Sequence, residues 1–186
     1  LPANIGNLIK LTKLPLNTNR LSVLPTSIGG LTSLEELNLV GNKLTVLPDE
    51  ITNITSLKKL ELQSNEFTSL PSTIGNLSNL ESINVNYQSK TENNVTIKTL
   101  TSIPASTKDL IKLVTFYSVG NKITGLVDLS GTDVLHQLNV SDNEISDLKL
   151  GGYPTGFQSR SYNVRQNPFI TCIEVATADI TKWEGI

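Results

Sequence analysis

The sequence contains very little that could support catalysis or covalent cross-linking. It has a single cysteine, Cys172, and a single histidine, His136. One cysteine cannot form a disulfide within the chain, and neither residue has neighbours at the spacing of a zinc site. We expect Cys172 to be a small buried core residue and His136 to have a packing or solvent-exposed role. The sequence also lacks a glycine-rich phosphate loop and a G-x-S-x-G motif. It therefore predicts a protein that is not an enzyme and needs no metal or cofactor.

Charge, long apolar runs and methionine are scarce as well. Charged residues make up 17% of the chain and the net charge is −2, which argues against a nucleic-acid partner. No segment approaches the ~18 consecutive apolar residues of a membrane-spanning helix, so we expect no membrane span. The chain has no methionine and starts within a repeat, and we therefore expect it to be a processed or trimmed product.

What the sequence does have is leucine at a fixed spacing. Repeats begin every 23 residues at first and at similar steps later, at Leu11, Leu34, Leu57, Leu80, Leu113, Leu135 and Ser159. A period of this size predicts stacked supersecondary units that share one elongated core. The longer step from Leu80 to Leu113 indicates one repeat with a polar insertion of about ten residues that includes Gln88–Asn94.

Each repeat contains the alternation of a short β-strand. The fourth and sixth residues are apolar, as in Leu37 and Leu39, and the residue between them is free to be polar, as in Asn38. This period of two predicts one inward and one outward face. The sixth position is apolar in every repeat except the one that has Ser118.

The ninth residue of the repeat is the most specific signal. It is Gln88 in the repeat with the insertion, and asparagine elsewhere. The asparagines are Asn19, Asn42, Asn65, Asn121, Asn143 and Asn167. An inward asparagine just after a strand can bond the backbone of adjacent coils, which predicts a structural asparagine ladder.

The back half of the repeat changes along the chain. Up to residue 110 it follows the pattern L-P-x-x-I-x-x-L, as in Leu47–Ile54, which predicts short helical or 3₁₀ turns. Beyond Leu113 the prolines disappear from this position, and Leu126–Leu129 and Leu148–Leu150 predict a second, minor β ladder. The fourteenth residues, which include Leu126, Leu148 and Cys172, are expected to point inward.

The spacing L-x-x-L-x-L-x-x-N-x-L in Leu57–Phe67 resembles the leucine-rich repeat family. The resemblance implies an α/β, β-rich solenoid. Such a solenoid is a right-handed superhelix with a parallel concave β-sheet and short helical or 3₁₀ turns on its convex side. We expect a single leucine-rich repeat domain over residues 1–186. It divides into a partial repeat (1–10), regular repeats (11–79), a repeat with an insertion (80–112), divergent repeats (113–158) and a C-terminal repeat and cap (159–186).

Several segments carry a narrower resemblance. Thr73–Leu77 resembles the L-P-x-x-I-G-N-L repeats of bacteria and plants, whereas Leu126–Ser130 and Leu138–Asn143 resemble repeats of Bacteroidetes cell-surface proteins. Asn167–Val175, followed by Trp183, is similar to the C-terminal cap of those proteins. The resemblance implies a secreted or surface-anchored bacterial protein, located at the cell surface or outside the cell, that holds its partners non-covalently.

Outward residues of adjacent strands lie about 4.8 Å apart, so they form a continuous surface. The candidate ligand contacts on this surface are Glu36, Asn38, Lys59, Glu61, Gln63, Asn84, Tyr87, Tyr117, Asn139, Asn163 and Arg165. The charges that alternate at its start are explained either by pairing across strands or by a patch for a charged partner. The amides and tyrosines suit protein contacts, could equally hold a sugar, or merely tolerate a crowded ladder. The insertion is either a functional rim loop or a disordered spacer.

Three functions are therefore open. The first is a non-catalytic module for protein–protein interaction at the bacterial cell surface, with a protein partner. The second is a glycan-binding accessory protein. The third is the recognition domain of a larger effector. In addition, the first coil has no neighbour on its outer side, and an uncovered edge of this kind invites pairing with another chain.

Overall fold

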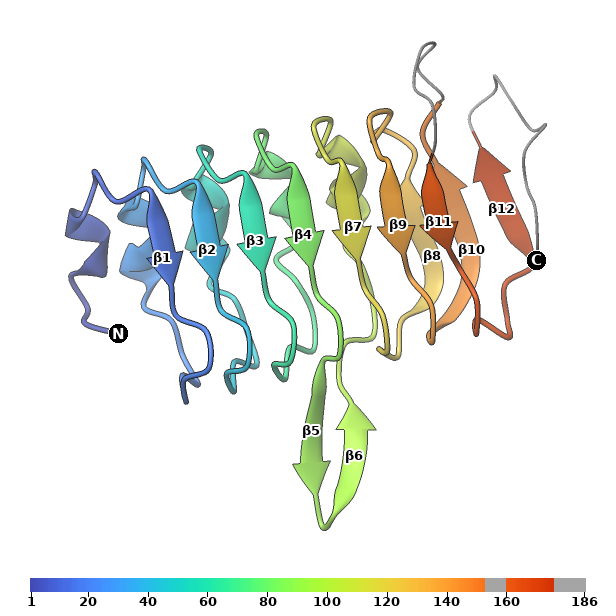
Figure 1. Ribbon diagram of the computed structural model, residues 1–186, viewed down its shortest axis with the longest axis horizontal. Coiled ribbons are helices and arrows are strands. Elements are labelled where there is room, and N and C mark those ends of the chain that lie inside the picture. Colours follow the sequence, from blue (N-terminus) through green and yellow to red (C-terminus); the bar gives the residue numbers. More distant parts are fainter. Residues whose placement is uncertain (153–159, 176–186) are drawn as a thin grey trace.

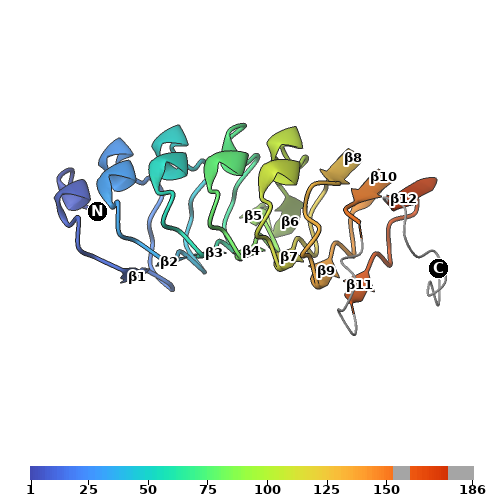
Figure 2. The same ribbon diagram turned by 90° about the horizontal axis from the view of Figure 1, so that it is seen from above.

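The computed structural model, which describes residues 1–152 and 160–175, is a solenoid of stacked coils (Figure 1). One short strand of each coil enters a parallel sheet, and the sheet forms one long side of the molecule (Figure 2). Within the described residues this sheet contains, in order, β1 (Lys13–Pro15), β2 (Glu36–Asn38), β3 (Lys59–Glu61), β4 (Ser82–Asn84), β7 (Thr115–Tyr117), β9 (Gln137–Asn139) and β11 (Ser161–Asn163). The predicted leucine-rich repeat solenoid is thus confirmed.

The opposite, convex side of the solenoid is built in two ways. The earlier coils carry 3₁₀ turns, namely η1 (Ile5–Asn7), η2 (Thr26–Gly30), η3 (Asp49–Asn53), η4 (Ile74–Asn76) and η5 (Ala105–Asp109). Extended prolines such as Pro48 and Pro104 precede the turns, and an inward isoleucine such as Ile51 anchors them. Proline suits the position before the turn because its fixed φ favours entry into the turn. It also lacks a backbone N–H, which at this position would have no partner within the turn.

Later coils replace the turns with strands. A second parallel sheet has the order β12 (Cys172–Val175), β10 (Glu144–Leu150), β8 (Thr124–Leu129), which confirms the predicted minor ladder. Alternating apolar residues such as Val127 and Leu129 point into the core. With no proline to start a 3₁₀ turn, β-branched and aliphatic residues at a period of two favour an extended chain.

The core is one continuous spine between the two sides. Its inward leucines and isoleucines, together with Phe67 and Phe116, form a single buried cluster that runs through the coils. In β3, Leu60 is fully buried between the outward Lys59 and Glu61. Each coil therefore buries its apolar face against its neighbours, as a repeat that cannot form a core alone requires.

Two residues that we predicted to point inward do not. Leu126 is 45% exposed, and its neighbour Val127 is buried instead. Cys172 is also exposed, because it pairs with Asp147, while Ile173 pairs with Leu148. A β-bulge in β10, between Ile145 and Asp147, shifts the register by one residue. Beyond this bulge the buried Leu148 therefore pairs with Val127 and not with Leu126, although Leu126 and Leu148 hold the same position in their repeats.

The insertion after β4 is an ordered antiparallel hairpin and not a disordered spacer. Its strands are β5 (Ser89–Glu92) and β6 (Val95–Lys98), joined by Asn93 and Asn94, both of which have positive φ. Two residues with positive φ are typical of a tight two-residue hairpin turn. The hairpin projects from the edge of the solenoid at which the strands of the main sheet end (Figure 1).

Parts of the predicted C-terminal repeat and cap, including Ser159 and Trp183, lie outside the described residues.

Candidate binding surface

The asparagines after the strands hold neighbouring coils together. Asn65 is fully buried, and its side-chain amide donates to Leu39 O at 2.9 Å and to Leu62 O at 3.0 Å. Its Oδ1 accepts a hydrogen bond from Leu44 N at 3.1 Å. One side chain therefore satisfies backbone groups in two successive coils, which would otherwise be buried without partners. The same arrangement recurs at Asn42, Asn143 and Asn167.

The remaining ladder positions show how the pattern adapts. Gln88 is fully buried, accepts a hydrogen bond from Phe67 N and donates one to Leu62 O. At the base of the hairpin, its longer side chain therefore bonds the backbone of the preceding coil as the ladder asparagines do. Asn121 accepts from Gln88 N and donates to the hydroxyl of Ser118, the polar residue at an apolar strand position. Asn19 is exposed and donates only to carbonyls of its own coil, because no complete coil precedes it in the structure.

Charged residues on the concave face are paired with each other in the N-terminal coils. Lys13 and Glu36 form a 2.7 Å ion pair between β1 and β2, and Lys59 and Glu61 form a 3.0 Å pair within β3. The hydrogen bond from Lys13 to Glu36, reinforced by the negative charge of that carboxylate, raises the pKa of Lys13. These pairs are solvent-exposed and contribute little stability. Because each lysine is paired with a glutamate, they give this part of the face no excess of positive or negative charge.

The asparagines that end β2, β4, β9 and β11 share one geometry. In each, Oδ1 accepts a hydrogen bond from the backbone N–H two residues later, at 3.1 Å. This local bond satisfies the N–H at the end of the strand, as Asx turns do. The four residues are Asn38, Asn84, Asn139 and Asn163, and all are half-buried.

Two further polar side chains complete the later part of the face. Asn86 Oδ1 accepts a hydrogen bond from Val119 N in the next coil, at 2.6 Å. The hydroxyl of Tyr117 donates to Gln137 Oε1 on β9. Gln63, in contrast, has a buried Oε1 with no hydrogen-bond partner in the described residues. Arg165 is exposed at the far end.

Tyr87 lies at the rim, where the hairpin leaves the solenoid. Its φ of 55° is in the left-handed region, and its side chain is 55% exposed. A Cβ atom on Gly120 would lie 2.5 Å from Cδ1 of Tyr87, so the ring needs a glycine beneath it. Next to it, Lys98 of β6 forms a 2.8 Å ion pair with Asp142. Tyr87 and this ion pair join the hairpin to the two following coils.

The structure brings most of the predicted contact residues onto one surface, with the exception of Tyr87, which lies at its rim. The period of two predicts that Asn86 and Gln137 also face outward, although neither is among the predicted ligand contacts. Sequence reasoning did not single out Lys98 or Asp142 as members of this surface. Lys98 and Asp142 are 44 residues apart, and no local signal connects them.

Other features of the molecule do not form a site with evident chemistry. In the described residues, no group of three or more His, Cys, Asp and Glu side chains is arranged to hold a metal ion. Nδ1 of His136 lies 2.6 Å from Val134 O. Within the same residues, no helix has the length and apolar character needed to cross a membrane.

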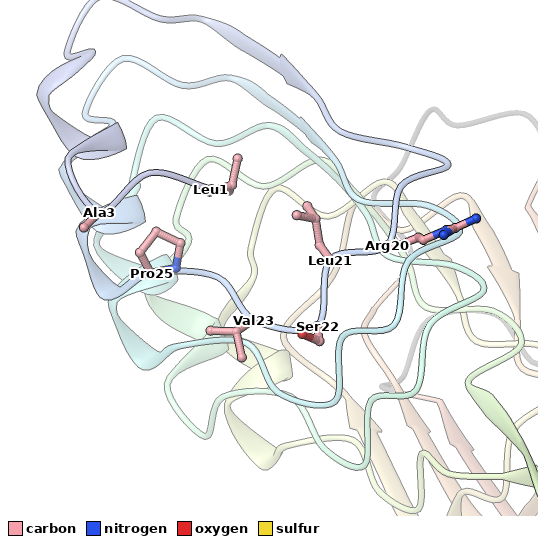
Figure 3. A pocket seen from close by; sticks show the side chains of 7 residues that line it. All are labelled: Leu1, Ala3, Arg20, Leu21, Ser22, Val23 and Pro25. Atoms are coloured by element: carbon pink, nitrogen blue, oxygen red, sulfur yellow. The ribbon is translucent and has the colours of Figure 1, made fainter.

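A hollow of about 360 Å³ lies at the N-terminal end of the solenoid (Figure 3). Its lining includes Leu1, Leu21, Val23 and Pro25. Leu21 and the strand leucines of the first coil are partly exposed, whereas the corresponding residues of the second coil are buried. The hollow is therefore the open end of the apolar spine and is separate from the outward side chains of the sheet.

Comparison with known proteins agrees with this architecture. Residues 1–105 match the family model of the leucine-rich repeat region. Comparison with curated protein sequences finds no significant match.

Several solved structures are similar. A leucine-rich repeat protein of Leptospira interrogans, LIC12759, is 28% identical with a TM-score of 0.66, over 95% of this chain and 51% of that chain. The Arabidopsis receptor kinase HAESA, solved with the peptide hormone IDA and the co-receptor SERK1, is 20% identical with a TM-score of 0.70, over 95% of this chain and 31% of that chain. InlJ of Listeria monocytogenes is 17% identical with a TM-score of 0.59, over 92% of this chain and 45% of that chain.

The present chain thus spans about half of the Leptospira protein and less of the other two. The last two likenesses concern the fold alone. With more than half of its residues matched by the family model, the chain belongs to the leucine-rich repeat family.

Proposed function

We propose that this domain is a non-catalytic binding module that presents its concave sheet face to a protein partner at a bacterial cell surface. Leucine-rich repeat domains are generally binding modules without catalytic activity. The observation that carries the proposal is the continuous outward surface of seven strands, charged in the N-terminal coils and made of amide, hydroxyl and tyrosine side chains in the later ones, which is supported by a buried ladder. A preformed surface of this kind loses little conformational entropy on binding.

The bacterial surface setting is supported by two observations. The later repeats and the cap resemble those of Bacteroidetes surface proteins, and a Leptospira leucine-rich repeat protein is structurally similar over most of this chain. A glycan ligand is the second candidate, because Tyr117 lies among amide side chains on the sheet. Sugars are commonly held by such a combination of aromatic and polar groups.

A binding experiment with matched variants tests the proposal. A pull-down with purified domain identifies the partner, and a glycan array on the same sample tests the alternative. Tyr117→Ala and Glu61→Lys should each weaken partner binding while leaving the midpoint of unfolding nearly unchanged, since both side chains lie on the outward face.

Val46→Ser is the control, because Val46 is 60% exposed and lies between β2 and η3, outside the sheet. This substitution should change neither property. Equal loss of binding and of stability in the Tyr117 and Glu61 variants would indicate a structural role instead. If only Val46→Ser impairs binding, the interface lies outside the outward face of the sheet.

A further inference from the structure

The concave face is chemically divided. In the N-terminal coils its outward side chains include the carboxylates of Glu36 and Glu61, each engaged by a lysine. The outward side chains of β4, β7, β9 and β11 include no aspartate or glutamate. We refer to this later part of the surface, from β4 to β11, as the donor face.

The amide orientations on the donor face are fixed by the backbone. An N–H group can donate only to the oxygen of a side-chain amide, so the bonds from Asn86 N, Ser141 N and Arg165 N determine where each Oδ1 lies. The NH₂ groups of Asn84, Asn139 and Asn163 must then point away from these bonds.

The backbone also fixes the amide of Asn86, which uses its oxygen for Val119 N. Gln137 in turn accepts a hydrogen bond from the Tyr117 hydroxyl through its oxygen. No hydrogen bond from the NH₂ group of any of these five amides to another described residue is present. Five amides thus have their oxygens engaged within the protein and their N–H donors unengaged.

From this asymmetry we infer that the donor face binds a segment of polypeptide rich in aspartate and glutamate, which deepens the proposed protein-binding function and rests on it. A carboxylate is an acceptor-only group with about four lone-pair sites, so it matches a row of donors. Hydrogen bonds to a charged acceptor are roughly twice as strong as neutral ones.

The surrounding charges are compatible with an acidic ligand. Arg165 is exposed at one end of the donor face. At the rim, the carboxylate of Asp142 is held by Lys98 at 2.8 Å, so its charge is compensated. Like-charge repulsion is therefore small where the segment would lie, and the guanidinium of Arg165 offers a bidentate partner for a carboxylate.

A neutral glycan fits the donor face less well. Each sugar hydroxyl is both a donor and an acceptor and needs protein acceptors as well as donors. Here each amide oxygen already accepts a hydrogen bond within the protein, and the hydroxyl of Tyr117 donates to Gln137. The carboxylates of an acidic peptide need only donors from the surface, and the peptide can lie extended across successive strands about 4.8 Å apart.

The test uses two labelled peptides and measures their affinity for the whole domain by fluorescence anisotropy. One peptide alternates aspartate and glutamate with serine, and the other has asparagine and glutamine at the acidic positions. We expect the acidic peptide to bind about tenfold or more tightly than its amide counterpart, since a bond to a charged partner contributes about 1.4 kcal/mol or more.

Asparagine-to-aspartate substitutions localise the site. In Asn139→Asp and Asn163→Asp the retained Oδ1 still accepts the backbone hydrogen bond, while the outward NH₂ donor becomes an oxygen with negative charge. Each variant should lose about tenfold in affinity for the acidic peptide.

Asn38→Asp is the matched control, because Asn38 makes the same 3.1 Å backbone bond outside the donor face. Two strand spacings, about 10 Å, separate it from the nearest strand of the donor face, and four spacings, about 19 Å, separate it from Asn139. The screening length in 0.1 M salt is about 10 Å. Its effect should stay below about twofold, since the added charge is largely screened.

Several outcomes would overturn the inference. These are equal affinity for the two peptides, no binding of the acidic peptide, equal effects of Asn38→Asp and Asn139→Asp, or binding of a sulfated glycan such as heparin without binding of the acidic peptide. If a protein partner found by pull-down still requires Tyr117 in any of these cases, the proposed function stands and only the acidic chemistry is wrong. If no substitution on the concave face weakens binding of the partner, both the proposed function and the acidic chemistry are wrong.

Discussion

The two halves of the convex side show how much freedom the repeat allows. From η1 to η5 the convex side is made of 3₁₀ turns, and from β8 to β12 it is a parallel sheet. The opposite side does not change, since three-residue strands continue in register from β1 to β11. The repeat therefore specifies its strand side strictly and its convex side only loosely.

The physical reason lies in what each side must satisfy. On the strand side, leucines must fill the core while an asparagine bonds the backbone of adjacent coils, as Asn65 does. On the convex side, the chain only has to return while it buries a few apolar residues, such as Ile51 and Ile54 or Val127 and Leu129. Proline selects the 3₁₀ turn, and its absence with alternating apolar residues selects the strand.

A proline substitution should reveal this difference most strongly. Lys149→Pro removes an N–H in β10, which is hydrogen-bonded on both sides by β8 and β12. We expect a loss of about 3 kcal/mol or more in the free energy of unfolding, measured by urea denaturation. Lys149→Ala is the control for loss of the 3.0 Å ion pair with Glu174, which is exposed and contributes little stability.

The matching change in the first half is Asp49→Pro. Asp49 is the first residue of η3 and follows Pro48, whose extended ψ of 142° already suits a residue before proline. Its cost should be below about 1 kcal/mol, because the N–H lost is one that the turn leaves without an internal partner. Equal costs at positions 49 and 149 would refute the distinction between the two convex structures.

A pair of threonines at the boundary between the halves should give smaller effects of opposite sign. Thr107 occupies in η5 the buried place of Ile51 in η3, and its hydroxyl has no hydrogen-bond partner among the residues that the structure describes. Thr132, one coil later, is equally buried but donates to Leu129 O at 2.7 Å. Thr107→Val should raise the free energy of unfolding by about 1 kcal/mol, and Thr132→Val should lower it by a similar amount. A stability change of the same sign in both would contradict this account.

The smallest effect concerns the charges on the convex sheet. Burial of Asp128 on β8 raises its pKa, but hydrogen bonds from Ser130 and the charges of Lys108 and Lys149 outweigh burial and leave the pKa below its usual 3.8. An acid whose pKa is lowered by folding stabilises the fold above its unfolded-state pKa, and this contribution disappears as the pH falls through the folded value.

The urea midpoint should therefore fall slightly more for the wild type than for Asp128→Asn as the pH is lowered below about 4. A change with pH that is the same in the two proteins would show that Asp128 is not responsible.

Local sequence is sufficient to predict the repeat, the strand positions, the buried asparagines and the switch of the convex side from turns to strands. These follow from local rules, because side-chain direction in a strand has a period of two and proline fixes φ wherever it occurs. The polar residues Gln88 and Ser118 were also visible as exceptions to the repeat, although their bonds to Phe67 N and Asn121 were not.

The remaining features depend on the tertiary structure. The bulge before Asp147 sets the register in which Leu148 pairs with Val127 and with Ile173, while Leu126 and Cys172 lie on the exposed side. The hairpin is linked to a later coil by the ion pair of Lys98 with Asp142, far apart in the chain. The direction of each concave amide depends on which backbone N–H reaches its oxygen. Register and hydrogen-bond partner are properties of two chain segments together, so no single stretch of sequence contains them.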